Sequence, residues 1–254
     1  MPTMIVILVP LFGMSWVLGH VTRKTPYNHL AAAVIFVISM LNGLHYVHVF
    51  DQSIVYYQFR SLEIADYLPA LSGYALGYFV AHFRGLVYAP FKAIAIAASL
   101  YAMFLPVAKE ITNPLILYGA PRFVVNGVLV QRTNSTCGPC SLAVILDSYG
   151  ISKSEDEIAM ASRTSASGTE LWYLARYARS LGFRAEFRFD NGTVFESSII
   201  GIRLGQTGHF VAVLRVDGNE VLIHDSTSGL KTISFQDLRG RFQYSGISLL
   251  IRRA

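Results

Sequence analysis

The chain has 254 residues, which is enough for one large domain or two modest ones. It is 53% hydrophobic and 15% charged, with a mean hydropathy of +0.43, which is too apolar for an ordinary soluble protein. This composition excludes intrinsic disorder, and two cysteines exclude a disulfide-dense secreted scaffold. The net charge of +5 comes without a cluster of Lys and Arg, so it does not indicate nucleic-acid binding.

Charged side chains are distributed unevenly along the chain. Residues 1–110 carry six basic and four acidic residues, whereas residues 111–254 carry the other 15 basic and 12 acidic ones. The first density is typical of a membrane segment and the second of a soluble domain. We therefore expect an all-α transmembrane domain at residues 1–118 and a water-soluble domain at residues 119–254.

Four segments of the first half are candidates for membrane-spanning helices, each of which needs roughly 20 apolar residues. A mixed, aromatic segment at residues 51–66 is expected to lie at the membrane interface. The start of the chain lacks a basic region and a small-residue cleavage site, so we expect a permanent anchor in a bacterial inner membrane. The four expected spans are residues 2–22, 25–50, 67–83 and about 86–107.

The basic residues in the short loops predict an orientation. Arg23 and Lys24 follow the first span, and Arg84 lies between the third and fourth, with Lys92 near the start of the fourth. Arg60 is the one basic residue between the second and third. The positive-inside rule then favours both termini, and with them the soluble domain, outside the cytoplasm. Gaining or losing one span would reverse this orientation.

The soluble half begins with a strand-like segment, Phe123–Gln131, and continues with helical patterns. One helix follows Cys137 and stops at Gly150, a second opens at the capping box Ser154-x-x-Glu157, and a third runs from Gly168 to about Ser180. The period then changes to that of strands, and helices followed by antiparallel strands indicate an α+β fold. The expected strands are Phe183–Phe189, Ser198–Arg203, His209–Val216, Glu220–Asp225 and Ile247–Arg252.

Cys137 lies at the start of the first of these helices, where the positive end of the helix dipole favours a thiolate. A nucleophilic thiol needs a base for its proton, a group that orients that base, and donors for the oxyanion. Gln131, six residues before Cys137, has an amide that can serve as such a donor beside the Cys137 backbone N–H.

The soluble half contains two histidines, His209 and His224. His209 begins a strand and Asp225 ends the next one, and a hairpin turn at residues 217–219 would bring these two ends together. The pair would then be a base with its orienting carboxylate. His224, next to Asp225, points to the opposite side of its strand and is expected to be solvated.

Five short motifs, in this order and with these gaps, resemble the papain-like leader-peptidase domain of bacteriocin-exporting ABC transporters. That family cleaves after a double glycine in the leader of a secreted peptide. The resemblance covers roughly residues 122–254 and implies a cysteine peptidase without a metal or cofactor, with Cys137 as nucleophile, His209 as base, Asp225 as its orienter and Gln131 as oxyanion donor. The motifs are Gln131-x5-Cys137-Gly138-x3-Leu142, Tyr149-Gly150, Gly168-Thr169 with Leu174 and Gly182-Phe183, His209-Phe210-Val211-x-Val213-Leu214, and Asp225-x3-Gly229.

The chain departs from that family in several places. Thr136 stands where an acidic residue often precedes the nucleophile, and Ser226 stands where a proline often follows the aspartate. The membrane spans come before the peptidase-like half, and no G-x-x-x-x-G-K-[ST] phosphate loop is present. ATP is therefore not an expected ligand, and a separate exporter would be the partner that moves the cleaved peptide.

Two other functions remain open at this point. Cys137-Gly-Pro-Cys140 is also the dithiol sequence of thioredoxin-like oxidoreductases, but those place a cis-proline loop later in the chain, and no proline follows Pro139. The other alternative is a non-catalytic module that holds a leader peptide without cutting it. We therefore expect a membrane-anchored cysteine peptidase, whose substrate is a peptide with a Gly-Gly-like site and whose membrane contact is lipid.

Overall fold

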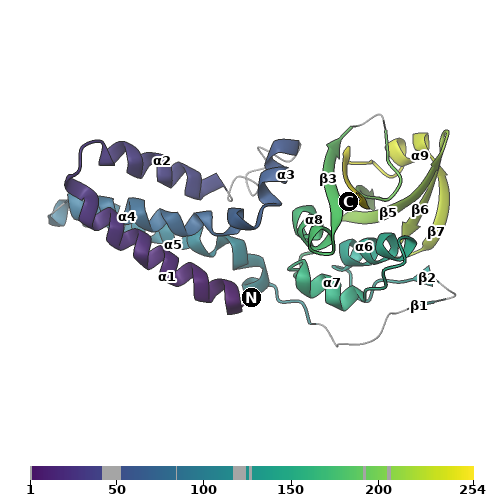
Figure 1. The fold of residues 1–254 in the computed structure, drawn as a ribbon, viewed down its shortest axis with the longest axis horizontal. Helices are drawn as coiled ribbons and strands as arrows, with labels where there is room; N and C mark the ends of the chain where they lie inside the picture. Colours follow the sequence, from purple (N-terminus) through teal and green to yellow (C-terminus); the bar gives the residue numbers. More distant parts are fainter. Residues whose placement is uncertain are drawn as a thin grey trace. The chain divides into compact units, whose positions relative to one another are not determined.

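The computed structural model describes residues 2–41, 53–83, 85–116, 124–125, 128–190, 193–204 and 207–254 (Figure 1). They form two compact units. The first comprises Met1–Asp51 and Leu62–Thr112, and the second comprises Gln52–Ser61 and Asn113–Ala254. The predicted boundary between residues 118 and 119 falls in the stretch 117–123, which lies outside the described residues.

The first unit is helical. Its helices are α1 (Pro2–Val21), α2 (Asn28–Met40), α4 (Ser72–His82) and α5 (Ala89–Thr112). Within the described residues, α1 and α5 are long and apolar enough to cross a membrane. The expected number of four spans stays a prediction, because α2 and α4 are shorter and residues 42–50 of the second expected span lie outside the described residues.

Three glycines allow α1 and α4 to approach closely. A Cβ atom placed on Gly19 of α1, or on Gly73 or Gly77 of α4, would overlap a backbone carbonyl oxygen of the facing helix. Gly73 and Gly77 are four residues apart and therefore lie on one face of α4. Small residues at this spacing are the usual means by which two helices in a membrane pack backbone to backbone.

Several polar side chains of the first unit lie inside it, whereas many of its large apolar side chains are exposed. The Ser72 hydroxyl donates to the carbonyl of Ser99 at 3.2 Å, and the Tyr74 hydroxyl donates to the Asn28 side chain. On the outside, Val6, Met14 and Ile94 are each about two-thirds exposed, and many other large apolar residues are exposed as well. Such an exterior suits an apolar solvent, because soluble monomers rarely expose extended apolar surface.

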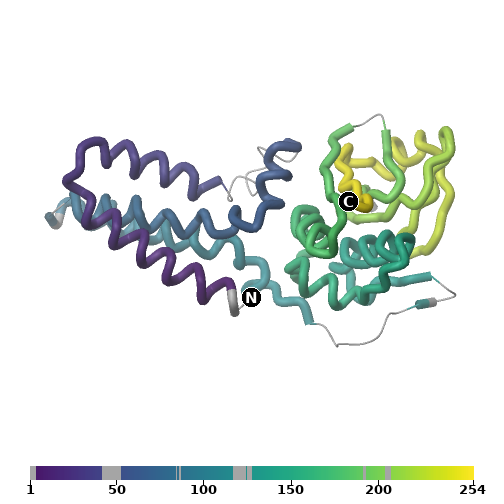
Figure 2. Tube along the Cα trace, viewed as in Figure 1, coloured from purple at the N-terminus to yellow at the C-terminus, as the bar shows by residue number. Residues whose placement is uncertain are grey.

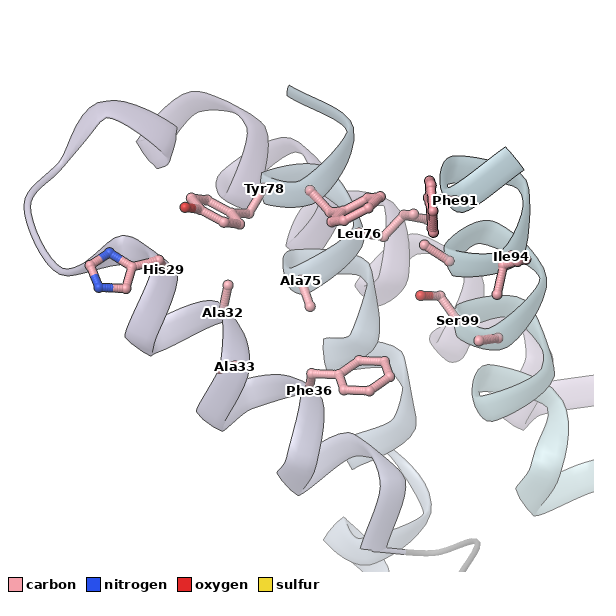
Figure 3. Close-up of a pocket in the computed structure, with 13 residues that line it drawn as sticks. His29, Ala32, Ala33, Phe36, Ala75, Leu76, Tyr78, Phe91, Ile94 and Ser99 are labelled. Atoms are coloured by element: carbon pink, nitrogen blue, oxygen red, sulfur yellow. The ribbon is translucent and has the colours of Figure 1, made fainter. Parts of the chain in front are cut away.

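A cavity of about 420 Å³ opens between α2, α4 and α5 (Figure 3). Alanines from all three helices line it, and these short side chains leave the space between the backbones unfilled. Its lining is apolar except for His29, Tyr78 and Ser99.

The second unit contains a six-stranded antiparallel sheet preceded by three helices, α6 (Cys137–Ser148), α7 (Glu155–Ala161) and α8 (Leu171–Ser180). The predicted α+β fold is confirmed, and the strands at Phe183–Phe189 and Glu220–Asp225 have the predicted bounds. The strand at Gly229–Ser234 and the short helix α9 (Phe235–Gly240) after it are additions to the prediction. The strand order is β3 (Phe183–Phe189), β8 (Ile247–Arg253), β4 (Ser198–Leu204), β5 (Thr207–Asp217), β6 (Glu220–Asp225) and β7 (Gly229–Ser234).

The sheet has an apolar core on each face, because neighbouring strand residues point in opposite directions. Ile199 belongs to the core that Leu142 of α6 and Leu174 of α8 share. Ile200 belongs to the second core, which Leu238 of α9 closes. The sheet is therefore fixed from both sides, and its strand ends are rigid supports for functional groups.

One segment of the N-terminal half packs into this second unit. Helix α3 (Ile54–Arg60) lies beside β3 and α8, where the blue segment meets the green ones in Figure 2. The Tyr57 ring lies 5.6 Å from the ring of Trp172 and 5.4 Å from that of Phe187, and Arg179 donates to the Ser61 hydroxyl at 2.7 Å. The interfacial position predicted for residues 51–66 is therefore wrong for α3, whose tyrosines are buried in a protein core.

The predicted strand Phe123–Gln131 is also different in the structure. It is replaced by a small antiparallel hairpin of β1 (Val124–Val125) and β2 (Val128–Leu129). The intervening residues 126–127 lie outside the described residues. Their sequence, Asn-Gly, is the pair that most strongly favours a two-residue hairpin turn, so the local signal for a hairpin is present in the sequence.

Candidate active site

Cys137 is the first residue of α6 and is 8% exposed. The helix begins as predicted, and the backbone N–H of Cys140 donates to the Thr136 carbonyl at 2.9 Å. One turn into the helix, the Ser141 hydroxyl donates to the Phe210 carbonyl at 3.2 Å. This contact fastens the start of α6 to strand β5, which carries His209 next to Phe210.

A β-bulge decides which face of the sheet carries the candidate aspartate. The pairing of β5 with β6 shifts by one residue between positions 213 and 215. Beyond the shift, Ala212 lies opposite His224, and continuing that register gives Asp225 the same face as His209. Without the bulge, Asp225 would lie opposite Ala212 and face away from His209, because a slip of one residue reverses every side chain.

His209 and Asp225 are in direct contact. His209 Nε2 lies 2.9 Å from Asp225 Oδ1, and the two side chains are 7% and 5% exposed. Asp225 also accepts hydrogen bonds from the Thr227 backbone and hydroxyl and from the Ser228 hydroxyl, and Lys231 Nζ lies 3.6 Å from Oδ2. Burial opposes ionisation of this carboxyl, but these donors and His209 hold the pKa of Asp225 well below its usual range.

His209 has an unusually high affinity for a proton. Burial by itself lowers the pKa of the ring, but the hydrogen bonds to Asp225 and to Cys137 outweigh burial and raise the pKa of His209 to about 9. At neutral pH the ring is therefore an imidazolium held between a carboxylate and the Cys137 sulfur. The neutral ring can accept the thiol proton, and the imidazolium that results is the counter-charge for a thiolate.

Gln131 reaches the same end of the sheet through the residue after Asp225. Its backbone N–H donates to the Ser226 carbonyl at 3.1 Å, and its side-chain Oε1 accepts from the Ser226 hydroxyl at 2.5 Å. The structure thus brings Cys137, His209 and Asp225 into one hydrogen-bonded chain and ties Gln131 to the strand end beside them.

Glu155 supports the loop between Gln131 and Cys137, and the sequence interpretation does not include it. Its side chain is 1% exposed, and its Oε1 accepts from the Arg132 backbone N–H at 3.0 Å. Burial raises the pKa of Glu155, although hydrogen bonds from Thr136 and Arg132 act in the opposite direction. In the sequence, Glu155 is an acidic residue in the first turn of an expected helix, where it would be explained by the helix dipole. This pattern does not predict its contact with the Arg132 backbone.

His224 is not solvated, contrary to the prediction. It is 3% exposed, and burial lowers its pKa. It lines a cavity of about 280 Å³ together with Val128 of the β1–β2 hairpin and Val144 of α6. The hairpin and α6 thus cover the face of β6 that carries His224. Side-chain alternation along one strand shows that this face is opposite to Asp225, but it does not show what covers it.

The second cysteine of the pair is turned into the core. Cys140 is fully buried, and its Sγ lies 3.8 Å from the Leu129 carbonyl oxygen. Cys137 and Cys140 are both free thiols. The hydrogen-bond partners of the two sulfurs are therefore different, His209 for Cys137 and a backbone carbonyl for Cys140.

Solved structures similar to this chain come from transporter peptidases. The peptidase domain of Streptococcus ComA, a bifunctional ABC transporter involved in a quorum-sensing pathway, is 22% identical, with a TM-score of 0.44 over 50% of this chain and 98% of that domain. A double-glycine motif protease from an AMS/PCAT transporter, solved with a leader peptide, is also 22% identical, with a TM-score of 0.44 over 54% of this chain and 96% of that one.

Curated relatives include two uncharacterized proteins. One from Methanothermobacter thermautotrophicus is 27% identical over 127 residues, which are 50% of this chain and 88% of that protein. One from Methanothermobacter marburgensis is 32% identical over 109 residues, 42% of this chain and 77% of that protein. The sequence profile of the peptidase C39 family matches residues 126–254, the part of the chain that contains the six-stranded sheet and the candidate active site. This protein therefore belongs to the peptidase C39 family.

Proposed function

We propose that this protein is a membrane-anchored cysteine peptidase that cleaves a secreted or membrane-associated peptide after a double glycine. The observation that carries this proposal is the hydrogen-bonded chain from Asp225 through His209 to Cys137, at the start of α6. Family membership supports the peptidase activity, and the double-glycine substrate is the expectation that the family resemblance provides.

In the proposed mechanism, the Cys137 sulfur attacks the carbonyl carbon of the scissile bond. Before this attack the thiol proton has passed to His209, which leaves a thiolate–imidazolium pair. His209 Nε2 is engaged by Asp225, so the other ring nitrogen, Nδ1, serves the sulfur. The imidazolium then donates this proton to the leaving amine, and an acyl-enzyme remains on the sulfur. Water activated by the neutral His209 ring hydrolyses the thioester and restores the free thiol.

The oxyanion of the tetrahedral intermediate needs donors that are already in place. The backbone N–H of Cys137, at a helix N-terminus, and the side-chain amide of Gln131 are assigned this role. Asp225 fixes the orientation of His209 and stabilises its charged form.

The first unit is assigned the role of membrane anchor. Its apolar exterior, its close glycine contacts between α1 and α4, and the length of α1 and α5 support this role. Residues 52–61 and 113–254 form one compact unit, so both segments must lie on the same side of a membrane. The chain between them would then cross an even number of times, which is compatible with the proposed four-span anchor, in which the segments of α4 and α5 would be the last two spans.

The loop charges favour a site outside the cytoplasm, in a bacterial inner membrane. This proposed orientation depends on the basic residues Arg23 and Lys24 after the first expected span and Arg84 and Lys92 around the start of the fourth. A separate exporter is the proposed partner, because the chain has no phosphate loop with which to use ATP.

The test uses the full chain, purified in detergent under reducing conditions, and a peptide library with Gly-Gly and other small-residue sites. Mass spectrometry identifies the products of the wild type, Cys137→Ala and the matched variant Cys140→Ala. We expect cleavage by the wild type and Cys140→Ala and none by Cys137→Ala, with the cut site defining the substrate class.

Two other results would refute the proposal. Tight binding of leader peptides by every variant, with no product, would indicate a recognition module. Disulfide reduction that either alanine abolishes would indicate a dithiol oxidoreductase.

A further inference from the structure

Ser226, which stands where the family often has a proline, contacts Gln131 in the fold. Its side chain is fully buried, and its hydroxyl donates to Gln131 Oε1 at 2.5 Å. The backbones of the same two residues are also joined, because Gln131 N–H donates to the Ser226 carbonyl at 3.1 Å. A proline at position 226 would lack the hydroxyl.

Hydrogen bonds hold the turn that carries Ser226. Asp225 Oδ1 accepts from the Thr227 N–H at 2.9 Å and from the Thr227 hydroxyl at 2.7 Å, and the Ser228 N–H donates to the Asp225 carbonyl at 3.1 Å. Gly229 closes the turn with a φ of 86°, a conformation that suits glycine. The Ser226 hydroxyl therefore has a fixed position relative to the carboxylate that orients His209.

An amide side chain has an accepting end and a donating end, and rotation about its last torsion exchanges them at little cost. Because the Ser226 hydroxyl donates to the Gln131 amide oxygen, the NH₂ group of that amide points away from Ser226. We propose that Ser226 is a positioning residue that holds the Gln131 amide with its NH₂ group directed to the oxyanion, and this inference rests on the peptidase function proposed above.

Loss of the Ser226 hydroxyl should affect only the step in which the oxyanion forms. Without it, the Gln131 amide can present its oxygen to the developing negative charge, which is repulsive. Removal of a complete oxyanion donor from a serine protease lowers kcat by about 10²–10³-fold. Loss of orientation alone should have a smaller effect, and we expect Ser226→Ala to lower kcat by about tenfold with KM unchanged.

The experiment compares two reactions of Cys137 in the full chain in detergent. Alkylation by iodoacetamide displaces iodide from carbon and forms no oxyanion, so it reports the thiolate and His209 alone. A peptide aldehyde ending in glycine forms a C–S bond with the thiolate, and its carbonyl π electrons move to oxygen, which becomes an oxyanion while His209 keeps its proton. Protection of Cys137 from alkylation gives the aldehyde binding constant without any turnover.

We expect Ser226→Ala to weaken aldehyde binding about tenfold while the rate and pH profile of alkylation stay unchanged. Ser226→Thr, which keeps a hydroxyl, should restore binding, and Ser226→Ala should have no further effect in a Gln131→Ala background. Ser198→Ala is the matched control, because Ser198 is also a fully buried serine that donates to a backbone carbonyl. It should change the melting temperature and leave aldehyde binding intact.

Unchanged aldehyde binding in Ser226→Ala would overturn the inference. A parallel loss of alkylation rate would overturn it as well, since Ser226 would then act through Asp225 and His209. Additive losses in the double variant would show that the two residues act separately. Failure of the wild type to cleave peptides would count against the proposed function alone, because the aldehyde and alkylation measurements need no cleavage.

Discussion

Replacement of Asp225 by asparagine should change the pH dependence of the candidate site. The substitution keeps the shape of the side chain and removes its charge. Because Asp225 and Cys137 both raise the pKa of His209, the ring in Asp225→Asn should keep the contribution of Cys137 alone and titrate below its wild-type pKa of about 9. The imidazolium would then be lost at lower pH than in the wild type.

The size of the effect follows from the fraction of protonated rings. With the wild-type pKa of about 9, nearly every His209 is an imidazolium at about pH 7.5, whereas a complete return to the ordinary value of 6.5 would leave only about one ring in ten protonated. Acylation by a thiolate–imidazolium pair should fall in proportion, by about tenfold in that limit. Loss of the orientation that the carboxylate imposes would add to this decrease.

The assay is kcat/KM for peptide cleavage between about pH 6 and about pH 10, together with the rate of Cys137 alkylation over the same range. The alkaline limb of wild-type kcat/KM should lie near pH 9, and in Asp225→Asn it should move to lower pH. Alkylation, which needs the thiolate but no proton from His209, should not fall on that limb in either protein. Asp217→Asn is the matched control, because Asp217 is an exposed carboxylate in the turn between β5 and β6. An alkaline limb that stays near pH 9 in Asp225→Asn would refute the assignment of His209 and Asp225 as a coupled pair.

Three further predictions concern packing. Tyr57→Ala should lower the free energy of unfolding of the second unit by about 3–5 kcal/mol in a denaturant titration, whereas Val55→Ala, at an exposed position of the same helix, should have little effect. Gly77→Leu should disrupt the contact between α1 and α4 and lower the yield of folded protein in detergent, but Gly13→Leu, where an added Cβ meets open space, should not. Cys140→Ala should keep wild-type cleavage under reducing conditions and lose about 1 kcal/mol of stability, and a loss of cleavage would show that its sulfur takes part in the chemistry.

Local features of the second unit could be predicted well because their signals are local. The strands β3 and β6 have the predicted bounds, and Ser154 caps α7 by accepting from the Glu157 N–H at 3.1 Å. Gly150 ends α6 with a φ of 79°. Each of these depends on a residue's own conformational preference or on a contact within one helical turn.

The candidate site was partly predictable. The residue types, their order and the hairpin between His209 and Asp225 indicated which side chains to consider, and their catalytic roles stay proposals. The positions of Glu155 and His224 could not be predicted, because each depends on an element far away in the sequence that covers it. The same holds for α3, whose aromatic residues suit a membrane interface and a protein core equally well.

The sequence by itself determined the two-part composition, the α+β order of elements and the candidate chemistry, because hydropathy, periodicity and residue type are local properties. Only the tertiary structure decided that Asp225 faces His209, that Ser226 meets Gln131 and that α3 belongs to the second unit. Side chains alternate along a strand with a period of two, so one bulged residue in β5 reverses which groups share a face. Such a shift depends on how two strands pair across the sheet, and the order of residues along one strand does not predict that pairing.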